Sequence, residues 1–364
     1  MTKERISYVD LGAGIMILWV ILLHAISTYL GMEWYGINRE VITDISLLPH
    51  GIHYYINPSG QITNMPVMVW FPYLHFVMPW FFYKSGQFFV KRSQLDLVRK
   101  DSHKLLRQFI IWSAVGYIFF LIFTWMNGML TWREVTYRVM KRLFLEGHVE
   151  INLPLWFLFT LIGVRQIANI VLPSKESKYY WLICVVIVLF GYVVSYAAFR
   201  WNHRLLPLWV ANGAAGLAFF TMGYSLQKYE KQWWLLLPCM AIYLACCIWK
   251  FPIVGMRGNT LTQGIYLLNM PACLAGIVVF NVLCGFLAKY LRSISLPFEI
   301  VGQYAMVIYV THGIIYRFIS RLIYFNKWES LMPYVFWIIV GVYAIFLPLS
   351  CYLSKKIHFS TRKV

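Results

Sequence analysis

The chain has 364 residues, of which 60% are hydrophobic, 18% aromatic and only 13% charged, with a mean hydropathy of +0.63. A soluble domain carries about 25% charged residues, so this composition, with its repeated long apolar runs, excludes an ordinary soluble domain. The net charge of +18 does not indicate nucleic-acid binding, because the basic residues cluster beside apolar segments, where they set orientation and meet anionic lipid headgroups.

Ten apolar runs are long enough to cross a bilayer of about 30 Å at 1.5 Å per residue. We therefore predict an all-α, polytopic bundle of about ten transmembrane helices, forming one integral-membrane domain over residues 1–364. With both termini in the cytoplasm, 19 of the 32 Lys and Arg residues lie inside, as the positive-inside rule favours. The runs cover residues 9–31, 66–90, 108–127, 153–173, 179–199, 205–227, 233–249, 264–288, 297–322 and 332–354.

Residues 11–31 carry one side chain that titrates near neutral pH, His24. An ionisable group at membrane depth is costly, so it usually faces a protein interior or a water-filled cavity. Histidine suits proton transfer, although a neutral ring bonded to a neighbouring helix is the alternative. Asp10 lies about 21 Å away along the helix axis, so it does not orient His24; it either caps the helix or binds a ligand.

The outer loops at 32–65 and 128–152 either form a substrate-facing surface or lie flat on the membrane. Between them, the second run ends with Pro79, Lys84 and Ser85-Gly86. We expect Pro79 to interrupt the helical hydrogen bonds and Ser85-Gly86 to form a close-packing site. Lys84 lies about 9 Å below the interface, where it either snorkels to the surface or acts on a substrate.

Basic residues follow before the third run, among them Lys104 and Arg107, which share a helix face at spacing i and i+3. They either bind a polyanion such as the phosphates of coenzyme A or follow the positive-inside rule. Trp156 opens the fourth run as an interfacial belt residue or a pocket wall. Just before it lie three polar residues whose spacing alone does not define a metal site, Glu146, His148 and Glu150.

In the ninth run, Tyr309 and His312 lie one turn apart on the same helix face. A second intramembrane histidine indicates either a polar cavity or a hydrogen bond between helices. The seven cysteines all lie in apolar segments and none is spaced for a metal site with histidine. They are therefore predicted to be small core residues and not a disulfide framework.

Four segments, in this order along nearly the whole chain, resemble acyltransferase family 3, the polytopic membrane enzymes that acylate sugars of bacterial surface glycans. Each segment is mostly aromatic and apolar, and their order and spacing together carry the resemblance. The segments are Tyr8-Val9-Asp10 with Leu22-Leu23-His24, Met78-Pro79-Trp80-Phe81-Phe82 with Ser85-Gly86, Leu155-Trp156-Phe157-Leu158, and Ile308-Tyr309 with His312.

The resemblance implies a multi-pass protein of the bacterial cytoplasmic membrane with both termini cytoplasmic. It implies transfer of an acyl group, most often acetyl, from cytosolic acyl-CoA to a hydroxyl of a cell-surface or exported glycan or glycolipid. Acetyl-CoA is then a co-substrate, and no tightly bound cofactor, metal or nucleic-acid partner is expected. The essential histidine of the family corresponds to His24, its acidic residue to Asp10, and its cytoplasmic basic pair is similar to Lys104 and Arg107.

One position departs from the family pattern. The family usually has Arg or Lys three residues after the acid, where this chain has Ala13. Helical spacing places Ala13 on the His24 face, so a charge expected in the donor channel is missing. We hypothesise that Lys84 supplies the charge; otherwise donor binding is altered, or this is a divergent member with reduced activity.

The chemistry also fits the residues by themselves. Acyl transfer to a sugar hydroxyl needs a base to take the proton, for which His24 is suited, and donors for the developing oxyanion. The expected catalytic residues are His24 and, from the resemblance, Asp10. The expected substrate-binding residues are Lys84, Ser85, Trp156, Tyr309 and His312. The alternatives are a transporter or flippase, since broken spans and intramembrane histidines also suit alternating access, and a catalytically silent subunit for glycan export, which Ala13 keeps open.

Restoring the missing charge tests the role of Ala13. We expect Ala13→Arg to bind acyl-CoA more tightly than the wild type, because a fixed cation attracts the phosphates of the donor. Equilibrium binding of acyl-CoA to both proteins measures this. Equal affinities would mean that the departure at Ala13 does not limit donor binding.

Overall fold

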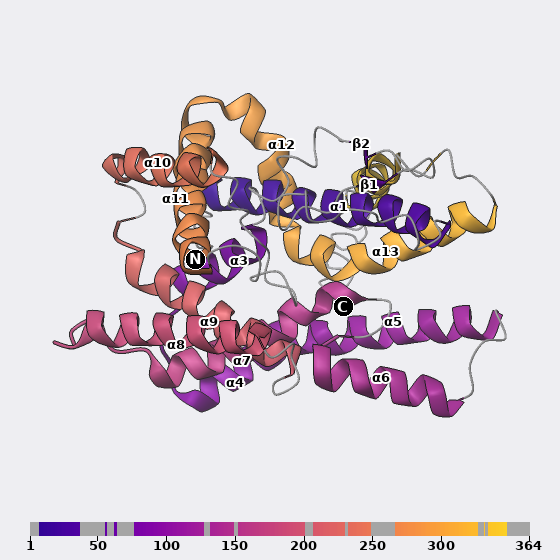
Figure 1. Cartoon of the computed structure of the whole chain (residues 1–364), viewed down its shortest axis with the longest axis horizontal. Coiled ribbons are helices and arrows are strands. Elements are labelled where there is room, and N and C mark those ends of the chain that lie inside the picture. The colour runs from indigo at the N-terminus through magenta and orange to yellow at the C-terminus, as the bar shows by residue number, and fades with distance from the viewer. Residues whose placement is uncertain are drawn as a thin grey trace, which may run out of the picture. The chain divides into compact units, whose positions relative to one another are not determined.

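A computed structural model of the protein describes residues 7–36, 55–56, 62–63, 76–126, 132–148, 152–200, 207–229, 232–248, 266–326, 331 and 334–347. These residues are almost entirely helical (Figure 1). Two short strands, β1 (Tyr55–Ile56) and β2 (Ile62–Thr63), pair antiparallel with Tyr55 opposite Thr63. The structure confirms the predicted all-α class.

The chain divides into two compact units, residues 1–38 with 293–364 and residues 39–292. In the first unit, α1 (Ser7–Gly36) runs beside α13 (Ala305–Phe325) (Figure 1). α12 (Arg292–Gln303) leads into α13, and a last apolar helix covers Val335–Leu347. The single domain predicted over residues 1–364 stays a prediction.

The second unit is built around α9, which packs against α3, α7 and α8, while α10 packs on α11. The elements in chain order are α3 (Val77–Gln87), α4 (Gln94–Asp101), the π-helical turn η4 (Ser102–Leu106), α5 (Arg107–Met126), α6 (Trp132–Glu146), the 3-10 turn η5 (Leu153–Leu155), α7 (Trp156–Val171), α8 (Tyr180–Arg200), α9 (Leu208–Leu226), the 3-10 turn η6 (Trp233–Leu235), α10 (Leu236–Ile248) and α11 (Tyr266–Tyr290).

Three stretches of the described helices are long and apolar enough to span a bilayer: Ser7–His24, Gln94–Ile122 and Met270–Tyr290. α12 and α13 add a fourth if they are counted as one broken span, and shorter apolar stretches of the described residues lie at Trp156–Val171, Tyr180–Ser195, Trp233–Cys246 and Val335–Leu347. α8 exposes Leu182, Val186 and Leu189 along one face, as lipid contact requires. The membrane character is confirmed, whereas the count of ten spans stays a prediction.

The predicted span at 297–322 is not one straight helix. α12 and α13 meet at a bend of 71°. At the bend the N–H of Tyr304 donates to the carbonyl oxygen of Val301, three residues earlier, at 3.0 Å. The chain thereby leaves the four-residue hydrogen-bond pattern of the α-helix and turns before the residues that carry His312.

Glycines let helices of the first unit touch backbone to backbone. A Cβ at Gly14 of α1 would collide with the carbonyl group of Phe298 in α12, and one at Gly302 of α12 would collide with the carbonyl group of Asp10 in α1. Small residues at such crossings replace the hydrophobic driving force that lipid does not provide.

Close backbone contact at glycines also joins α3 and α9 in the second unit. A Cβ at Gly86 would collide with the carbonyl group of Phe220, and one at Gly223 would collide with that of Tyr83. The close-packing site predicted at Ser85-Gly86 is therefore confirmed at Gly86.

The prediction for Pro79 is wrong for the described helix. α3 begins at Val77, so Pro79 is its third residue. The first four N–H groups of a helix have no intrahelical partner, and proline loses nothing there. The backbone N–H of Trp80 donates to the carbonyl oxygen of Phe76 at 2.8 Å and closes the first turn.

In the region 128–152, α6 buries Val139 and exposes Tyr137, Met140 and Phe144. Both roles predicted for this region, at a substrate surface or flat on the membrane, stay open. In the loop at 32–65, only residues 32–36 at the end of α1 and the strands β1 and β2 lie among the described residues.

Replacing Gly86 by alanine tests the α3–α9 crossing. We expect Gly86→Ala to lower the free energy of unfolding by about 1–3 kcal/mol, because the new Cβ meets backbone that cannot rotate away. The thermal unfolding midpoint in detergent measures the effect. Gly285→Ala in α11 is the matched control, because a Cβ there meets nothing within 4 Å; equal midpoints for the two variants would contradict the crossing.

Candidate functional site

The first unit brings two of the predicted residues together. The rings of His24 on α1 and His312 on α13 have their centroids 5.3 Å apart and are tilted by 44°. His24 also lies 6.0 Å, centroid to centroid, from Tyr316. Two imidazoles from segments far apart in the sequence therefore share one polar position within an apolar helix pair.

The helix that carries His312 fixes its tautomer. Its Nδ1 lies 2.7 Å from the carbonyl oxygen of Tyr309 and 3.1 Å from that of Ile308. Carbonyl oxygens only accept hydrogen bonds, so Nδ1 carries the hydrogen and Nε2 of the neutral ring is an acceptor. The side chain is fully buried, and Nε2 has no hydrogen-bond partner among the described residues. Such an acceptor suits a ligand hydroxyl.

Tyr309 packs beside His312 with a centroid separation of 5.7 Å. On the neighbouring turn, the hydroxyls of Thr311 and Tyr343 lie 2.7 Å apart. Tyr343 also donates to the carbonyl oxygen of Ile308 at 3.3 Å, one of the two carbonyls at His312. These bonds hold the backbone that orients the imidazole.

Asp10 lies in the first turn of α1, and its backbone is in the glycine contact with α12. His24 is 14 residues further along the same helix, or about 21 Å. Asp10 is therefore not part of the histidine pair, and its predicted roles as a cap or a ligand-binding group both stay open.

In the second unit, Lys84 is buried at 5% exposure. Its ammonium donates to the side-chain oxygen of Gln87 at 2.9 Å and lies 5.8 Å from the ring centre of Trp80 and 5.9 Å from that of Tyr83. Within its unit Lys84 does not snorkel to the surface, since aromatic faces and an amide solvate the charge. The indole N–H of Trp80 donates to Asn281 at 2.8 Å and fixes this aromatic wall.

Trp156 is buried at 6% exposure, which favours an internal position in its unit over a place in an exposed aromatic belt. It packs edge-on against Phe157, and Phe157 packs against Phe82 of α3 with a centroid separation of 4.8 Å. Ser85, three residues after Phe82 in the sequence, is half-buried. The predicted substrate roles of Trp156 and Ser85 stay predictions.

Lys104 and Arg107 are both exposed at the start of the third apolar run. Lys104 belongs to the π-helical turn η4, and Arg107 begins α5. π-Helical turns widen the helix locally and are frequent at functional sites. No pattern in the sequence predicts this turn.

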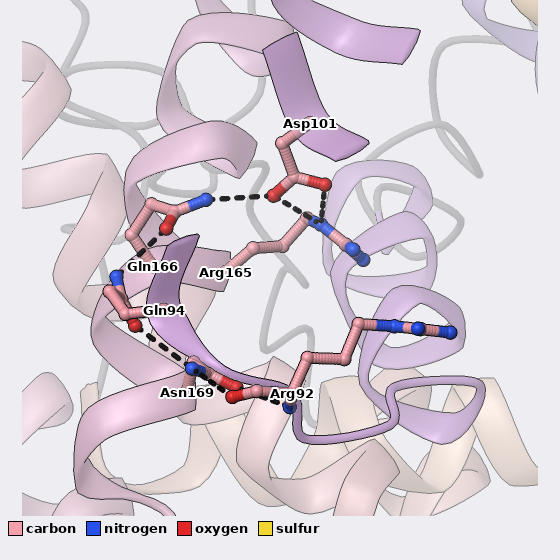
Figure 2. Close-up of polar contacts among 6 residues, drawn as sticks. All are labelled: Arg92, Gln94, Asp101, Arg165, Gln166 and Asn169. Carbon is pink, nitrogen blue, oxygen red and sulfur yellow. Dashed lines mark hydrogen bonds and ion pairs between the residues drawn. The ribbon is translucent and has the colours of Figure 1, made fainter. Parts of the chain in front are cut away.

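A hydrogen-bond network fixes the segment that leads into the π-helical turn (Figure 2). Asp101, 2% exposed, accepts from Nε of Arg165 at 3.0 Å and from the amide of Gln166 at 2.9 Å. Asn169 donates to the carbonyl oxygen of Arg92 at 3.0 Å and accepts from its backbone N–H at 3.1 Å. Gln94 links the two halves, since it donates to Gln166 at 2.9 Å and accepts from Asn169 at 2.8 Å.

Of the three polar residues expected at the outer mouth, only His148 has a side chain among the described residues. His148 is fully buried, whereas the side chain of Glu146 and the whole of Glu150 lie outside the described residues. No group of three or more metal-binding side chains occurs in the described part of the chain.

Sequence reasoning missed several residues that the structure places at these sites. Tyr316 follows His312 by four residues, so helical periodicity was a usable signal for it. Asp101 stands out as an acid within a basic stretch, which was a weaker signal. Nothing local in the sequence connects Asp101 to Arg165, 64 residues later.

Comparison with known proteins supports the resemblance. A family model described as an acyltransferase domain, that of acyltransferase family 3, matches residues 6–353. No curated protein and no solved structure matches the chain significantly.

The tautomer of His312 is open to direct measurement. We expect solid-state ¹⁵N spectra to show a protonated Nδ1 and an unprotonated Nε2 for this residue, because Nδ1 faces two carbonyl oxygens. The signals are assigned by their loss in His312→Asn. A protonated Nε2 in the neutral ring would contradict the arrangement.

Proposed function

Because the chain belongs to acyltransferase family 3, whose family model matches residues 6–353, we propose that it is a membrane O-acyltransferase. Membership makes it a membrane acyltransferase; the identity of the two substrates and of the base is our proposal. The donor is cytosolic acetyl-CoA, the acceptor is a hydroxyl of a cell-surface or exported glycan or glycolipid, and His24 is the general base.

The pairing of His24 with His312 is the observation that carries this proposal. The hydroxyl oxygen of the acceptor attacks the thioester carbonyl carbon while His24 takes the hydroxyl proton. The C–S bond then breaks, coenzyme A leaves as a thiolate, and the imidazolium returns the proton to the sulfur. The acyl group thus moves from sulfur to oxygen with no net change in protons.

His312 is suited to bind the acceptor sugar. Its Nε2 is a buried acceptor without a partner among the described residues, and sugars present neighbouring hydroxyls as donors. A hydroxyl bonded there lies beside His24, whose ring centre is 5.3 Å from that of His312. Holding the acceptor near the base lowers the entropic cost of the reaction.

The remaining predicted residues complete the proposal. Asp10 is the second catalytic residue, in addition to His24. Tyr309, Ser85, Lys84 and Trp156 contact the substrates, and Lys104 and Arg107 bind acyl-CoA from the cytoplasm. The protein works in the bacterial cytoplasmic membrane, with both termini cytoplasmic, so that donor and acceptor meet from opposite sides. It needs no tightly bound cofactor.

The bend between α12 and α13 favours one competing function, a transporter or flippase. Discontinuous membrane helices commonly form transport sites, and this bend of 71° is such a discontinuity. Acyl-CoA turnover distinguishes the two, since a transporter moves substrate without releasing coenzyme A. A catalytically silent export subunit would do neither.

Substitution of His24 tests the proposal. In nanodiscs with radiolabelled acetyl-CoA and bacterial envelope glycan, we expect His24→Ala to lower kcat by about 10²- to 10⁴-fold, because the general base is lost. We expect His312→Asn to raise the KM for the glycan by about tenfold, because a hydrogen bond to the acceptor is lost. Release of coenzyme A and label on the glycan are measured together.

His103→Asn is the control, since this exposed histidine lies on η4, outside the histidine pair. Thermal unfolding confirms that each variant is folded. Wild-type turnover that survives in His24→Ala would remove His24 as the base. Substrate flux without coenzyme A release would replace the acyltransferase by the transporter.

A further inference from the structure

Four basic side chains gather around the segment that leads into the π-helical turn. Arg92, Arg165 and Lys104 place their positive charges near that of Lys100, and Asp101 places a negative charge there. Like charges held at short range are unfavourable unless an anion joins them.

The hydrogen-bond network pairs only one edge of the Arg165 guanidinium with an acid. Asp101 engages Arg165 through Nε alone, and among the described residues the two terminal nitrogens of Arg165 make no hydrogen bond. Figure 2 shows the guanidinium tip of Arg165 turned away from Asp101. The free edge of a guanidinium is a fork that matches two phosphate oxygens.

Arg92 is also held by the network while its guanidinium stays outside it. Asn169, 8% exposed, binds both the backbone N–H and the carbonyl oxygen of Arg92. The bonds fix its backbone and leave the guanidinium outside the network (Figure 2). The guanidinium carbon of Arg165 lies 5.5 Å from the ring centre of Phe89. This contact holds the Arg165 side chain in place as well.

Among the described residues, the terminal nitrogens of Arg92 and Arg165 make no hydrogen bond, so this fixed scaffold is suited to a ligand that carries more than one negative charge. A single phosphate group can bind at most two guanidinium groups side by side. A diphosphate or a bisphosphorylated nucleotide carries enough phosphoryl oxygens to contact all four cations. The buried carboxylate of Asp101 costs free energy unless it is paired, and that pairing orients Arg165.

We propose that Arg92, Lys100, Lys104 and Arg165 form a binding site for phosphoryl groups, with Asp101 as the positioning residue. The phosphoryl groups belong to the donor nucleotide or to an anionic lipid headgroup. The first source rests on the proposed function, and the second does not.

Direct binding tests the site with the full chain in nanodiscs of neutral phosphatidylcholine, titrated with pyrophosphate and with coenzyme A. We expect Lys100→Gln and Arg165→Gln each to weaken binding of both probes by about tenfold, because each removes a charge-assisted contact. Arg165→Lys keeps the charge but loses the fork, and we expect a comparable loss. Asp101→Asn weakens binding through Arg165.

Arg99→Gln is the matched control. It removes one exposed positive charge from α4, the helix of Lys100, but Arg99 is not among the charges that bear on Lys100. We expect its affinity for both probes to stay within about twofold of the wild type. Thermal unfolding shows whether each variant is folded.

A second arm identifies the source of the phosphoryl groups. If the ligand is a lipid headgroup, nanodiscs with phosphatidylglycerol weaken pyrophosphate binding, and native mass spectrometry finds fewer retained anionic lipids in Arg165→Gln than in Arg99→Gln. If it is the nucleotide, coenzyme A binds equally in both bilayers. Either result supports the site.

The site is overturned if the wild type binds neither probe and retains no anionic lipid. It is also overturned if Lys100→Gln and Arg165→Gln behave like Arg99→Gln in both arms. Pyrophosphate binding does not depend on acyl transfer, so a wild type that binds it without turnover would contradict the proposed function and leave this site intact.

Discussion

Close backbone contact at glycines is the constraint on which both units depend. Lipid gives helices no hydrophobic reason to associate, so they gain packing energy by close approach. Gly14 and Gly302 bring α1 against α12, and Gly86 and Gly223 bring α3 against α9. A side chain at any of these positions meets peptide carbonyls, which cannot move without disturbing the helix. The helices that carry the functional residues are therefore held by small residues without chemistry of their own.

Among the described residues of the first unit, Nε2 of His312 is a buried acceptor without a hydrogen-bond partner. Tyr343 and Thr311 bond to each other, and His312 uses Nδ1 on its own helix. A buried acceptor without a partner is unfavourable, so a hydroxyl that donates to Nε2 would remove this cost. The bend between α12 and α13 also helps to place this histidine, because it redirects the chain a few residues before it.

In the second unit, a hydrogen-bond network lies beside a group of positive side chains. Asp101 and the amides of Gln166, Gln94 and Asn169 form a continuous chain of hydrogen bonds (Figure 2). This network fixes the backbone while positive side chains crowd at its edge. Screening by water and salt lowers the repulsion at a partly exposed site. The cations can therefore lie together without a bound anion, and a bound anion would stabilise them.

The sequence by itself determined the membrane character, the all-α class and the family, because apolar length and local motifs are read without knowing any contact. It also singled out His24, Tyr309 and His312, since polar groups in apolar runs are conspicuous. Only the tertiary structure decided that His24 and His312, 288 positions apart, lie ring to ring, that Asp101 holds Arg165, and that the ninth run is bent. Such pairings depend on which helices cross and where they touch, and no local pattern in the chain encodes that choice.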